Sequence, residues 1–398
     1  MTLLAQETQE ILNSSPVTLE KLSTSPVIKL KELYKSNLQF RNDIDEAFKN
    51  LQNMPADYTH RPNNNYWKLS NRANFDSLFM FFYKWSLFAP TTEDGLFAFI
   101  EPFYEFYYNN EPAIRIVTQS PGYEWTKYFL DWRKKFMDSP QSLWTIDDWK
   151  IDPSWNDYII PEGGFKSFNE LFTRKIKSGL RPIDEPHDLS ILVSPSDSRL
   201  NKVENKLSEY DCITTKVRQK LSIKQLLDNS IFHSMFIDGS ALSFVLMPNN
   251  YHHWHAPLSG IVVESRENVL GNYFGNPNFP DFFKNKNLGY NSDFSVFEVY
   301  RRGYYIFKTI SYGYVAMITV GLDDVSSINF EPKFKDISED NGSVVKKGEL
   351  MGHFAYGGSM IILLFQRNVL PIDTKISIDI LQGKKVAKLN PVIVNNMN

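Results

Sequence analysis

The sequence predicts an α+β protein with a helical N-terminal domain, residues 1–155, followed by a mainly β domain, residues 156–398. In the first domain, apolar residues of "SPVIKLKELYKSNLQFRNDIDEAFKNLQNMP" recur at three- and four-residue steps, as in amphipathic helices. In the second, short β-branched runs such as "ALSFVLMPNN" and "SMIILLFQ" are separated by Gly, Pro, Asn and Asp, which is typical of strands and turns. Strands do not alternate with crossover helices, so we do not expect a doubly wound parallel sheet.

Aromatic residues mark the helical domain. Seven of the eight tryptophans fall between Trp67 and Trp155, and "GYEWTKYFLDWRKKFMDSP" places Trp125, Phe129 and Trp132 at helical spacing. Packing between helices explains such a stripe better than stacking on a ligand.

Composition excludes several classes of function. The chain has 398 residues, 42% of them hydrophobic, and a net charge of -3, which gives no general attraction to nucleic acid. Its single cysteine, Cys212, excludes an intramolecular disulfide and fits a reducing compartment, so we expect a cytoplasmic protein.

No membrane-spanning or secretory segment is expected. The most apolar stretches are broken by charge or proline well short of the ~20 residues that a bilayer span needs. Glu7 and Glu10 stand where a secretory signal has a basic start. Peripheral contact with a membrane surface stays open.

Histidines gather at one point of the β domain. "NYHHWHAP" contains His252, His253 and His255, three of the seven histidines in the chain. Such a cluster suits a metal ion, simple packing, or proton transfer near neutral pH. Further ligands at metal-binding spacing are not evident, so we expect no metal.

An aspartate and a serine complete the set of candidate residues. Asp197 follows a β-run in "VSPSDSRL", and Ser359 follows Gly358 at the start of an apolar run in "AYGGSMIILLFQR". Each alone is typical of a turn or bulge. Together with a histidine they can form the base-assisted hydroxyl of a serine hydrolase. The GxSxG elbow is missing, however, and the serine precedes a strand, which disfavours an ordinary hydrolase.

Four motifs in order carry a resemblance to a known family. "FNELFTRKIKSGLRPI", "VSPSDSRL", "YHHWHAP" and "VKKGELMGHFAYGGSMIILLF" resemble the phosphatidylserine decarboxylase family of pyruvoyl-dependent enzymes. The helical half resembles the extension of soluble, amino-acid-acting members such as fungal tryptophan decarboxylases. "NGSVVKKGELMGHFAYGG" resembles the hairpin of lipoyl- and biotinyl-type sandwiches, so we expect a barrel-sandwich-like sheet core.

The resemblance implies that the chain cuts itself between Gly358 and Ser359. Ser359 would become a pyruvoyl cofactor at the head of chain 359–398, which would stay associated with chain 1–358. In the family the second histidine of the YHxxH motif, here His255, takes the serine proton, and the aspartate matching Asp197 orients it. His252 matches the proton donor or substrate positioner of the later decarboxylation, and His253 is interpreted as non-catalytic.

The implied enzyme is a carboxy-lyase. An amine of the substrate condenses with the pyruvoyl ketone to a Schiff base, and the carboxylate at the α-carbon leaves as carbon dioxide. Neither PLP nor a metal is implied.

Departures from the family pattern bear on the substrate. Gly357-Gly358-Ser359-Met360 stands where phosphatidylserine-specific members usually have Leu-Gly-Ser-Thr, and Ser198 stands where they have glycine. We therefore favour a free L-amino acid, aromatic such as tryptophan, over phosphatidylserine. A binding or scaffold protein that has lost self-processing is the alternative of another class. Residues 268–294, rich in Asn, Gly and Phe, form either a pocket wall or a surface insertion.

Strand geometry gives a check on the histidines. In a regular strand, His253 and His255 share one face and His252 points to the other. If His252 and His255 serve one site, a turn or bulge must lie between them.

Overall fold

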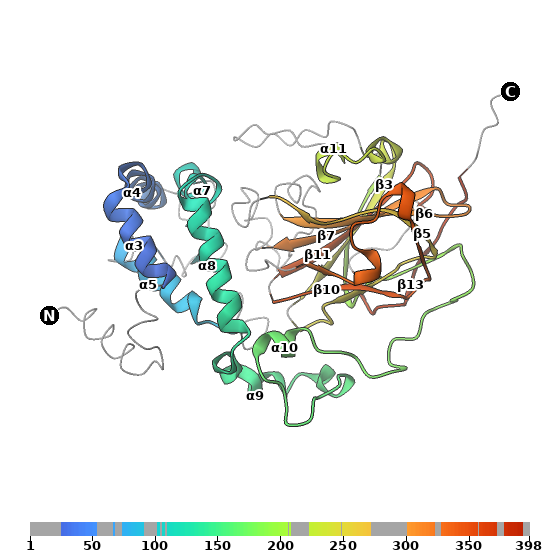
Figure 1. The fold of residues 1–398 in the computed structure, drawn as a ribbon, viewed down its shortest axis with the longest axis horizontal. Helices are drawn as coiled ribbons and strands as arrows, with labels where there is room; N and C mark the ends of the chain where they lie inside the picture. The colour runs from blue at the N-terminus through green and yellow to red at the C-terminus, as the bar shows by residue number, and fades with distance from the viewer. Residues whose placement is uncertain are drawn as a thin grey trace.

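The protein is described by a computed structural model covering residues 25–53, 67, 74–90, 102–103, 106–107, 110–205, 207, 223–247, 249–271, 301–322, 328–356, 358–371 and 378–392. Helices gather at the N-terminal side of the molecule and strands at the C-terminal side (Figure 1). The α+β prediction is therefore confirmed. Cys212, Gly357 and most of the stretch 268–294 lie outside the described residues.

Among its described residues, the helical region has five helices of two turns or more: α3 (Pro26–Ser36), α4 (Leu38–Asn53), α5 (Phe75–Ser86), α7 (Glu111–Thr118) and α8 (Gly122–Met137). The continuous apolar pattern before Pro55 is split into two helices at Asn37, whose side chain accepts a hydrogen bond from the Phe40 amide at 2.9 Å. Short elements then lead to the sheet: η2 (Pro140–Thr145), α9 (Ile146–Trp149), η3 (Pro153–Asp157) and α10 (Phe168–Phe172).

Aromatic rings form the centre of the helical region. The Phe82 ring lies edge-on to Trp125 and Phe129, with centroids 4.8 and 5.2 Å away, and stacks on Trp85 at 5.8 Å. All four side chains are buried. Each edge-to-face pair of this kind stabilises the fold by about 0.5–1.5 kcal/mol, beyond the stabilisation that comes from burying the apolar surface of the rings. These tryptophans are packing residues.

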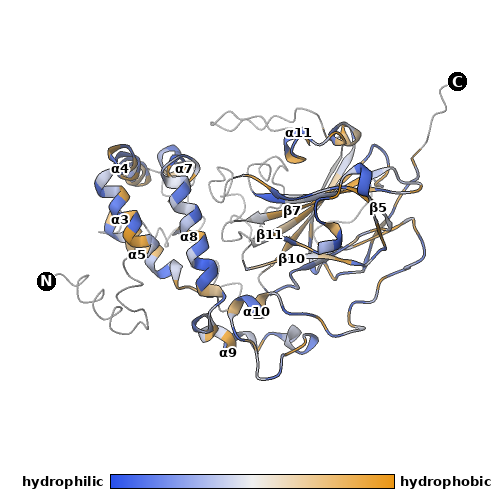
Figure 2. Ribbon diagram, in the orientation of Figure 1, coloured by the Kyte–Doolittle hydropathy of each residue, from blue (hydrophilic) through white to orange (hydrophobic). Residues whose placement is uncertain are grey.

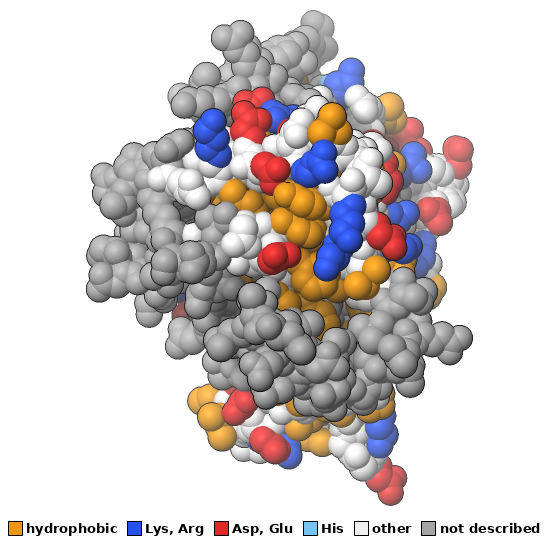
Figure 3. Space-filling view, turned by 90° about the vertical axis from the view of Figure 1, so that its left-hand side faces the viewer, with side chains coloured by type: hydrophobic (Ala, Val, Ile, Leu, Met, Phe, Trp, Pro, Cys, Tyr) orange, Lys and Arg blue, Asp and Glu red, His pale blue; other side chains and the backbone are white. Residues whose placement is uncertain are grey.

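The outer face of the helices carries apolar side chains next to lysines and arginines (Figure 3). Lys29 Nζ lies 3.5 Å from the centroid of the Tyr128 ring, and Lys31 Nζ lies 5.4 Å from that of Phe79. The lysine stems thus cover part of the apolar surface while their charges stay in water. Among the described helices, none is long and apolar enough to cross a membrane.

An eight-stranded antiparallel sheet forms the centre of the β region, in the order β12-β2-β3-β11-β7-β6-β5-β9. Its strands are β2 (Ser198–Asn205), β3 (Ser240–Leu246), β5 (Gly260–Val269), β6 (Arg302–Lys308), β7 (Tyr314–Leu322), β9 (Ser343–Val345), β11 (Gly358–Phe365) and β12 (Ile378–Ile380). A three-stranded sheet, β4-β10-β8, consists of β4 (His253–His255), β10 (Leu350–Phe354) and β8 (Ile328–Phe330). β1 (Ile191–Val193) pairs with β13 (Lys385–Lys388). The described strands form open sheets and no closed barrel.

Strand β11 is buried on both faces. Every side chain from Ser359 to Phe365 is buried. Met360, Ile362 and Leu364 join the apolar cluster of the helical region, whereas Ile361, Leu363 and Phe365 join a second cluster on the other face. Figure 2 shows the corresponding hydrophobic colouring in the interior of the sheet. An unbroken apolar run is what a strand covered on both faces requires.

Strand β4 settles the geometry of the histidines. His253 and His255 lie on one face, since the Tyr251 ring stacks on His253 at 4.8 Å and its hydroxyl lies 3.3 Å from His255 Nε2. The irregularity in the ladder lies in the facing strand β10, between Leu350 and Gly352. The turn or bulge expected between His252 and His255 is therefore absent, and these two histidines have different partners.

His253 is held neutral in the interior. Its side chain is buried, its Nε2–H donates to the Thr173 carbonyl at 2.9 Å, and its Nδ1 has no hydrogen-bond partner among the described residues. Burial lowers the pKa of His253 to about 3, helped by repulsion from the nearby His353, His255 and Lys175. Burial also lowers the pKa of His353, whose ring centroid is 5.2 Å away.

This burial makes stability depend on pH. Between pH 6.5 and 3 the unfolded chain binds a proton at His253 that the folded chain does not, so stability is complete above pH 6.5 and falls on acidification. At about 1.4 kcal/mol per pH unit, the loss by pH 5 is about 2 kcal/mol from this residue. In urea titrations, the free energy of unfolding of the parent should fall between pH 7.5 and 5.0. In His253→Gln we expect this fall to be smaller by about 2 kcal/mol. His187→Gln, at an exposed histidine, is the control. An unchanged pH dependence in His253→Gln would contradict the assignment.

Candidate functional site

Ser359 lies at the head of the central strand. It is the second residue of β11, paired with Leu246 of β3 on one side and Gly321 of β7 on the other, and is 1% exposed. The sequence placed this serine at the lip of a buried strand, and the structure agrees. A hydroxyl in this position is shielded from bulk water.

His252 is the histidine that contacts the serine. Its Nδ1 lies 3.2 Å from Ser359 Oγ, and the side chain is fully buried. The Phe172 ring from α10 stacks on the imidazole with a centroid distance of 3.7 Å. With its proton on Nε2, His252 accepts a hydrogen bond from the serine hydroxyl and is placed to take its proton.

His255 has other partners. Its Nδ1–H donates to the Gly348 carbonyl at 2.9 Å, which leaves Nε2 to accept from the Tyr251 hydroxyl at 3.3 Å. Burial lowers the pKa of His255, while the nearby Asp197 carboxylate acts in the opposite direction. His255 thus makes no hydrogen bond to Ser359, because it lies three residues after His252 in an extended segment and points to the opposite side.

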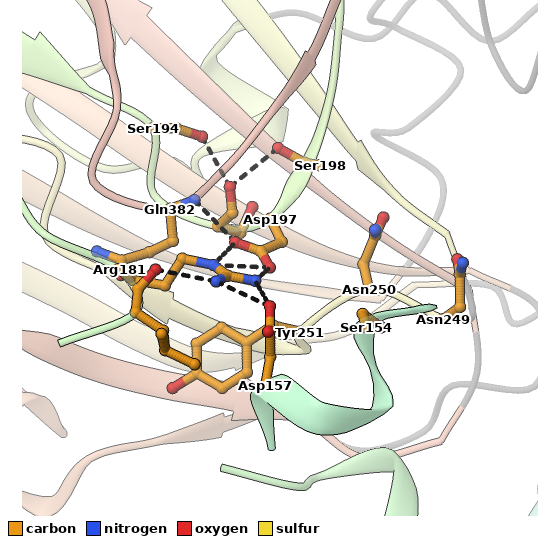
Figure 4. A network of polar contacts seen from close by, with 12 residues as sticks. Ser154, Asp157, Arg181, Ser194, Asp197, Ser198, Asn249, Asn250, Tyr251 and Gln382 are labelled. Atoms are coloured by element: carbon orange, nitrogen blue, oxygen red, sulfur yellow. Dashed lines mark hydrogen bonds and ion pairs between the residues drawn. The ribbon is translucent and has the colours of Figure 1, made fainter. Parts of the chain in front are cut away.

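Asp197 is held by an arginine. Arg181 Nε and Nη2 lie 2.9 and 2.6 Å from its two carboxylate oxygens, and the backbone N–H of Gln382 donates to Oδ1 at 2.8 Å (Figure 4). Asp157 Oδ2 lies 3.3 Å from Arg181 Nη1 on the other side of the guanidinium. The Arg181 and Asp197 side chains are 9% and 5% exposed. A bidentate pair of this kind fixes the carboxylate.

The expected hydrogen bond between Asp197 and His255 is therefore absent among the described residues. The aspartate lies near enough to act on the histidine through its field, but its oxygens accept hydrogen bonds from Arg181 and from the backbone N–H of Gln382. Sequence reasoning assigned no role to Arg181, although "SGLRPI" was part of the motif that carried the resemblance. The same holds for Phe172 in "FNELFTRK".

A cluster of aromatic side chains lies next to His252, the histidine at the serine. The Tyr356 ring lies edge-on to Phe168 and Phe172, with centroids 5.3 and 5.4 Å away. Phe168, Phe172 and Tyr356 are all buried. Within the described ranges, no three His, Cys, Asp or Glu side chains are grouped so that they could hold a metal ion.

Comparison with known proteins identifies the chain's relatives. The family model described as phosphatidylserine decarboxylase matches residues 168–388. A phosphatidylserine decarboxylase proenzyme of Fusobacterium nucleatum is 30% identical over 254 residues, which is 63% of this chain and 77% of that protein. One of Clostridium perfringens is 31% identical over 257 residues, 63% of this chain and 79% of its own length. Phosphatidylserine decarboxylase proenzyme 3 of Schizosaccharomyces pombe is 30% identical over 271 residues, 64% of this chain but 25% of that longer protein.

The site fits the cofactor of this family, a pyruvoyl group formed from a serine. Ser359 is buried, follows a glycine at the head of a strand, and has an imidazole nitrogen at its hydroxyl. No external cofactor has to be bound for such a group to form. The matched region and the similarity to the bacterial proenzymes show that this chain belongs to the phosphatidylserine decarboxylase family of pyruvoyl-dependent carboxy-lyases.

Proposed function

We propose that the chain cleaves itself at Gly358–Ser359 and then decarboxylates phosphatidylserine. The observation that carries the first part is the 3.2 Å contact between His252 Nδ1 and the buried Ser359 Oγ at the head of β11. Support for the second part comes from the relatives, which are named phosphatidylserine decarboxylase proenzymes. This lipid replaces the free amino acid favoured on sequence grounds.

Self-cleavage uses atoms of the chain and one water molecule. Ser359 Oγ loses its proton and attacks the Gly358 carbonyl carbon, so that a C–O ester bond forms and the C–N peptide bond breaks. Elimination of the ester leaves a carboxylate on Gly358 and a dehydroalanine at position 359. Water then adds, ammonia leaves, and a pyruvoyl group heads chain 359–398. Gly358 leaves this carbonyl open to attack because it has no side chain.

Proton transfer in the first step is assigned to His252. It is the base within hydrogen-bond distance of the attacking hydroxyl, which is the first requirement for a general base. His255 is the competing candidate from the family resemblance, and its Nε2 is instead placed on Tyr251. Asp197 and Arg181 then act as a fixed charge pair near His255.

For the mature enzyme, the pyruvoyl carbonyl supplies an electron sink for loss of carbon dioxide. Around it, Phe168, Phe172 and Tyr356 exclude water, and His252 holds a proton at Nδ1 or Nε2 for delivery to the substrate carbon. The proposed domains remain 1–155 and 156–398, with the cut inside the second.

Ser359→Ala should leave a single chain of 46.3 kDa, because no hydroxyl remains to attack Gly358. Intact-mass measurement of the parent should show two chains, 1–358 and 359–398. Ser343→Ala, at the start of another strand, is the matched control and should cleave like the parent. A parent that stays at full length under native conditions would sink the proposal and favour the processing-deficient alternative.

His252→Ala should slow self-cleavage by roughly 10²–10⁴-fold, the usual contribution of a general base, and His255→Ala by clearly less. Time courses of full-length chain on denaturing gels give both rates. The opposite order would assign the serine proton to His255, as the family resemblance implies.

Carbon dioxide release identifies the substrate. Cleaved protein should release it from phosphatidylserine in mixed micelles or vesicles and not from free serine or tryptophan, with Ser359→Ala as the blank. Faster release from tryptophan than from the lipid would restore the amino-acid assignment.

A further inference from the structure

We propose that Asn169 is a positioning residue through which the helical region sets the geometry of the scissile segment. The proposal rests on the self-cleavage proposed above. The family model matches residues 168–388, and the proposal assigns a task to residues before that region, which contact Asn169. It concerns the end of α8, the short helix α10, and the backbone at Tyr356.

Asn169 joins two segments through its side-chain amide. Its Oδ1 accepts a hydrogen bond from the backbone N–H of Tyr356 at 3.0 Å, and its Nδ2 donates to Asp138 Oδ1 at 2.6 Å. A backbone N–H only donates and a carboxylate only accepts, so the orientation of the amide is determined by its neighbours. Asp138 is the C-cap residue directly after α8.

Helix α10 is fastened to the helical side by further contacts. The Phe168 backbone N–H donates to Ser142 Oγ of η2 at 2.8 Å in the interior. The Trp149 ring of α9 lies edge-on to Phe168 with a centroid distance of 5.6 Å. Figure 1 shows α10 between the end of α8 and the sheet. Helix α10 is therefore joined to residues 138–149 by two hydrogen bonds and a ring contact.

From there α10 supports both partners of the reactive contact. Phe172 stacks on His252 at 3.7 Å, and Phe168 and Phe172 pack edge-on against Tyr356. From α8, the buried Arg133 guanidinium lies 5.5 Å from the centroid of the Tyr356 ring. Tyr356 is two residues before Gly358. The helical region thus reaches the histidine through α10, and the scissile segment through α10 and Arg133.

Attack by Ser359 depends on this placement. A hydroxyl oxygen must approach the preceding carbonyl carbon along one direction, and a misplacement of about 1 Å costs about 10²-fold in rate. Removing the acceptor for the Tyr356 N–H frees the segment that carries this carbonyl. The expected effect is on the rate of cleavage and not on whether the chain folds.

The test compares self-cleavage rates of full-length chains made by in vitro translation, followed after translation is stopped. Asn169→Ala should cleave about 10- to 100-fold more slowly than the parent, with its thermal midpoint within a few degrees. Asn169→Asp should also be slow, because two carboxylates then face each other. Combining Asn169→Asp with Asp138→Asn reverses the polarity of the pair, since the new amide at 138 donates to the new carboxylate at 169. That double variant should return to within about 3-fold of the parent.

Rescue by the reversed pair distinguishes a positioning role from general destabilisation. If the single variants were slow only because they are less stable, a second substitution would lower stability further and would not restore the rate. Parent-like cleavage in Asn169→Ala, or a double variant as slow as Asn169→Asp, would overturn the proposal. Either result leaves the proposed function standing, because that depends on the comparison between the parent and Ser359→Ala.

Discussion

The self-cleavage proposed for Ser359 requires a base within reach and shielding from bulk water, and at the head of β11 the serine is buried beside His252. The strand is covered on both faces, so alternate side chains point into two different apolar clusters. Ser359 shares its face with Ile361 and Leu363, and on that face lie Phe168, Phe172 and Tyr356. The hydroxyl therefore meets the imidazole of His252 among aromatic rings, where proton transfer does not compete with solvent.

The buried charges of the site lie away from the contact between His252 and Ser359. The ion pair between Arg181 and Asp197 lies near His255 and Tyr251, and not at the serine. Because both ions are nearly buried and well paired, removing one would leave an uncompensated charge in the interior. The site therefore consists of an apolar half, with His252 and Ser359, and a polar half, with His255, Asp197 and Arg181.

Local patterns predicted local structure well. The helical period of "GYEWTKYFLDWRKKFMDSP" corresponds to α8, and the apolar run after Gly358 corresponds to β11. The order of the strands could not be predicted from the sequence. β11 pairs with β3 and β7, and the hydrophobic pattern of a strand does not indicate which distant strand it pairs with. The break between α3 and α4 was missed because Asn37 interrupts the pattern with a cap and not with a proline.

Residue types at the site were predictable, but their pairing was not. Ser359, His252, His255 and Asp197 were all selected from motifs. Which histidine contacts the serine depends on which side of the sheet each side chain points to. The partner of Asp197 is Arg181, which lies in a segment without regular structure. The alternation rule for β4 was correct. The family resemblance assigns the serine proton to His255, whereas the histidine that lies at Ser359 Oγ is His252.

The position proposed for cleavage, between Gly358 and Ser359, has a consequence for the protein after it is cut. Residues 359–398 contain β11, β12 and β13, and each of these pairs with a strand from the larger chain: β3 and β7, β2, and β1. The smaller chain would thus supply β11 at the centre of the eight-stranded sheet and β12 at its edge. It could dissociate only by opening those ladders, so the lifetime of the two-chain complex equals the lifetime of the fold.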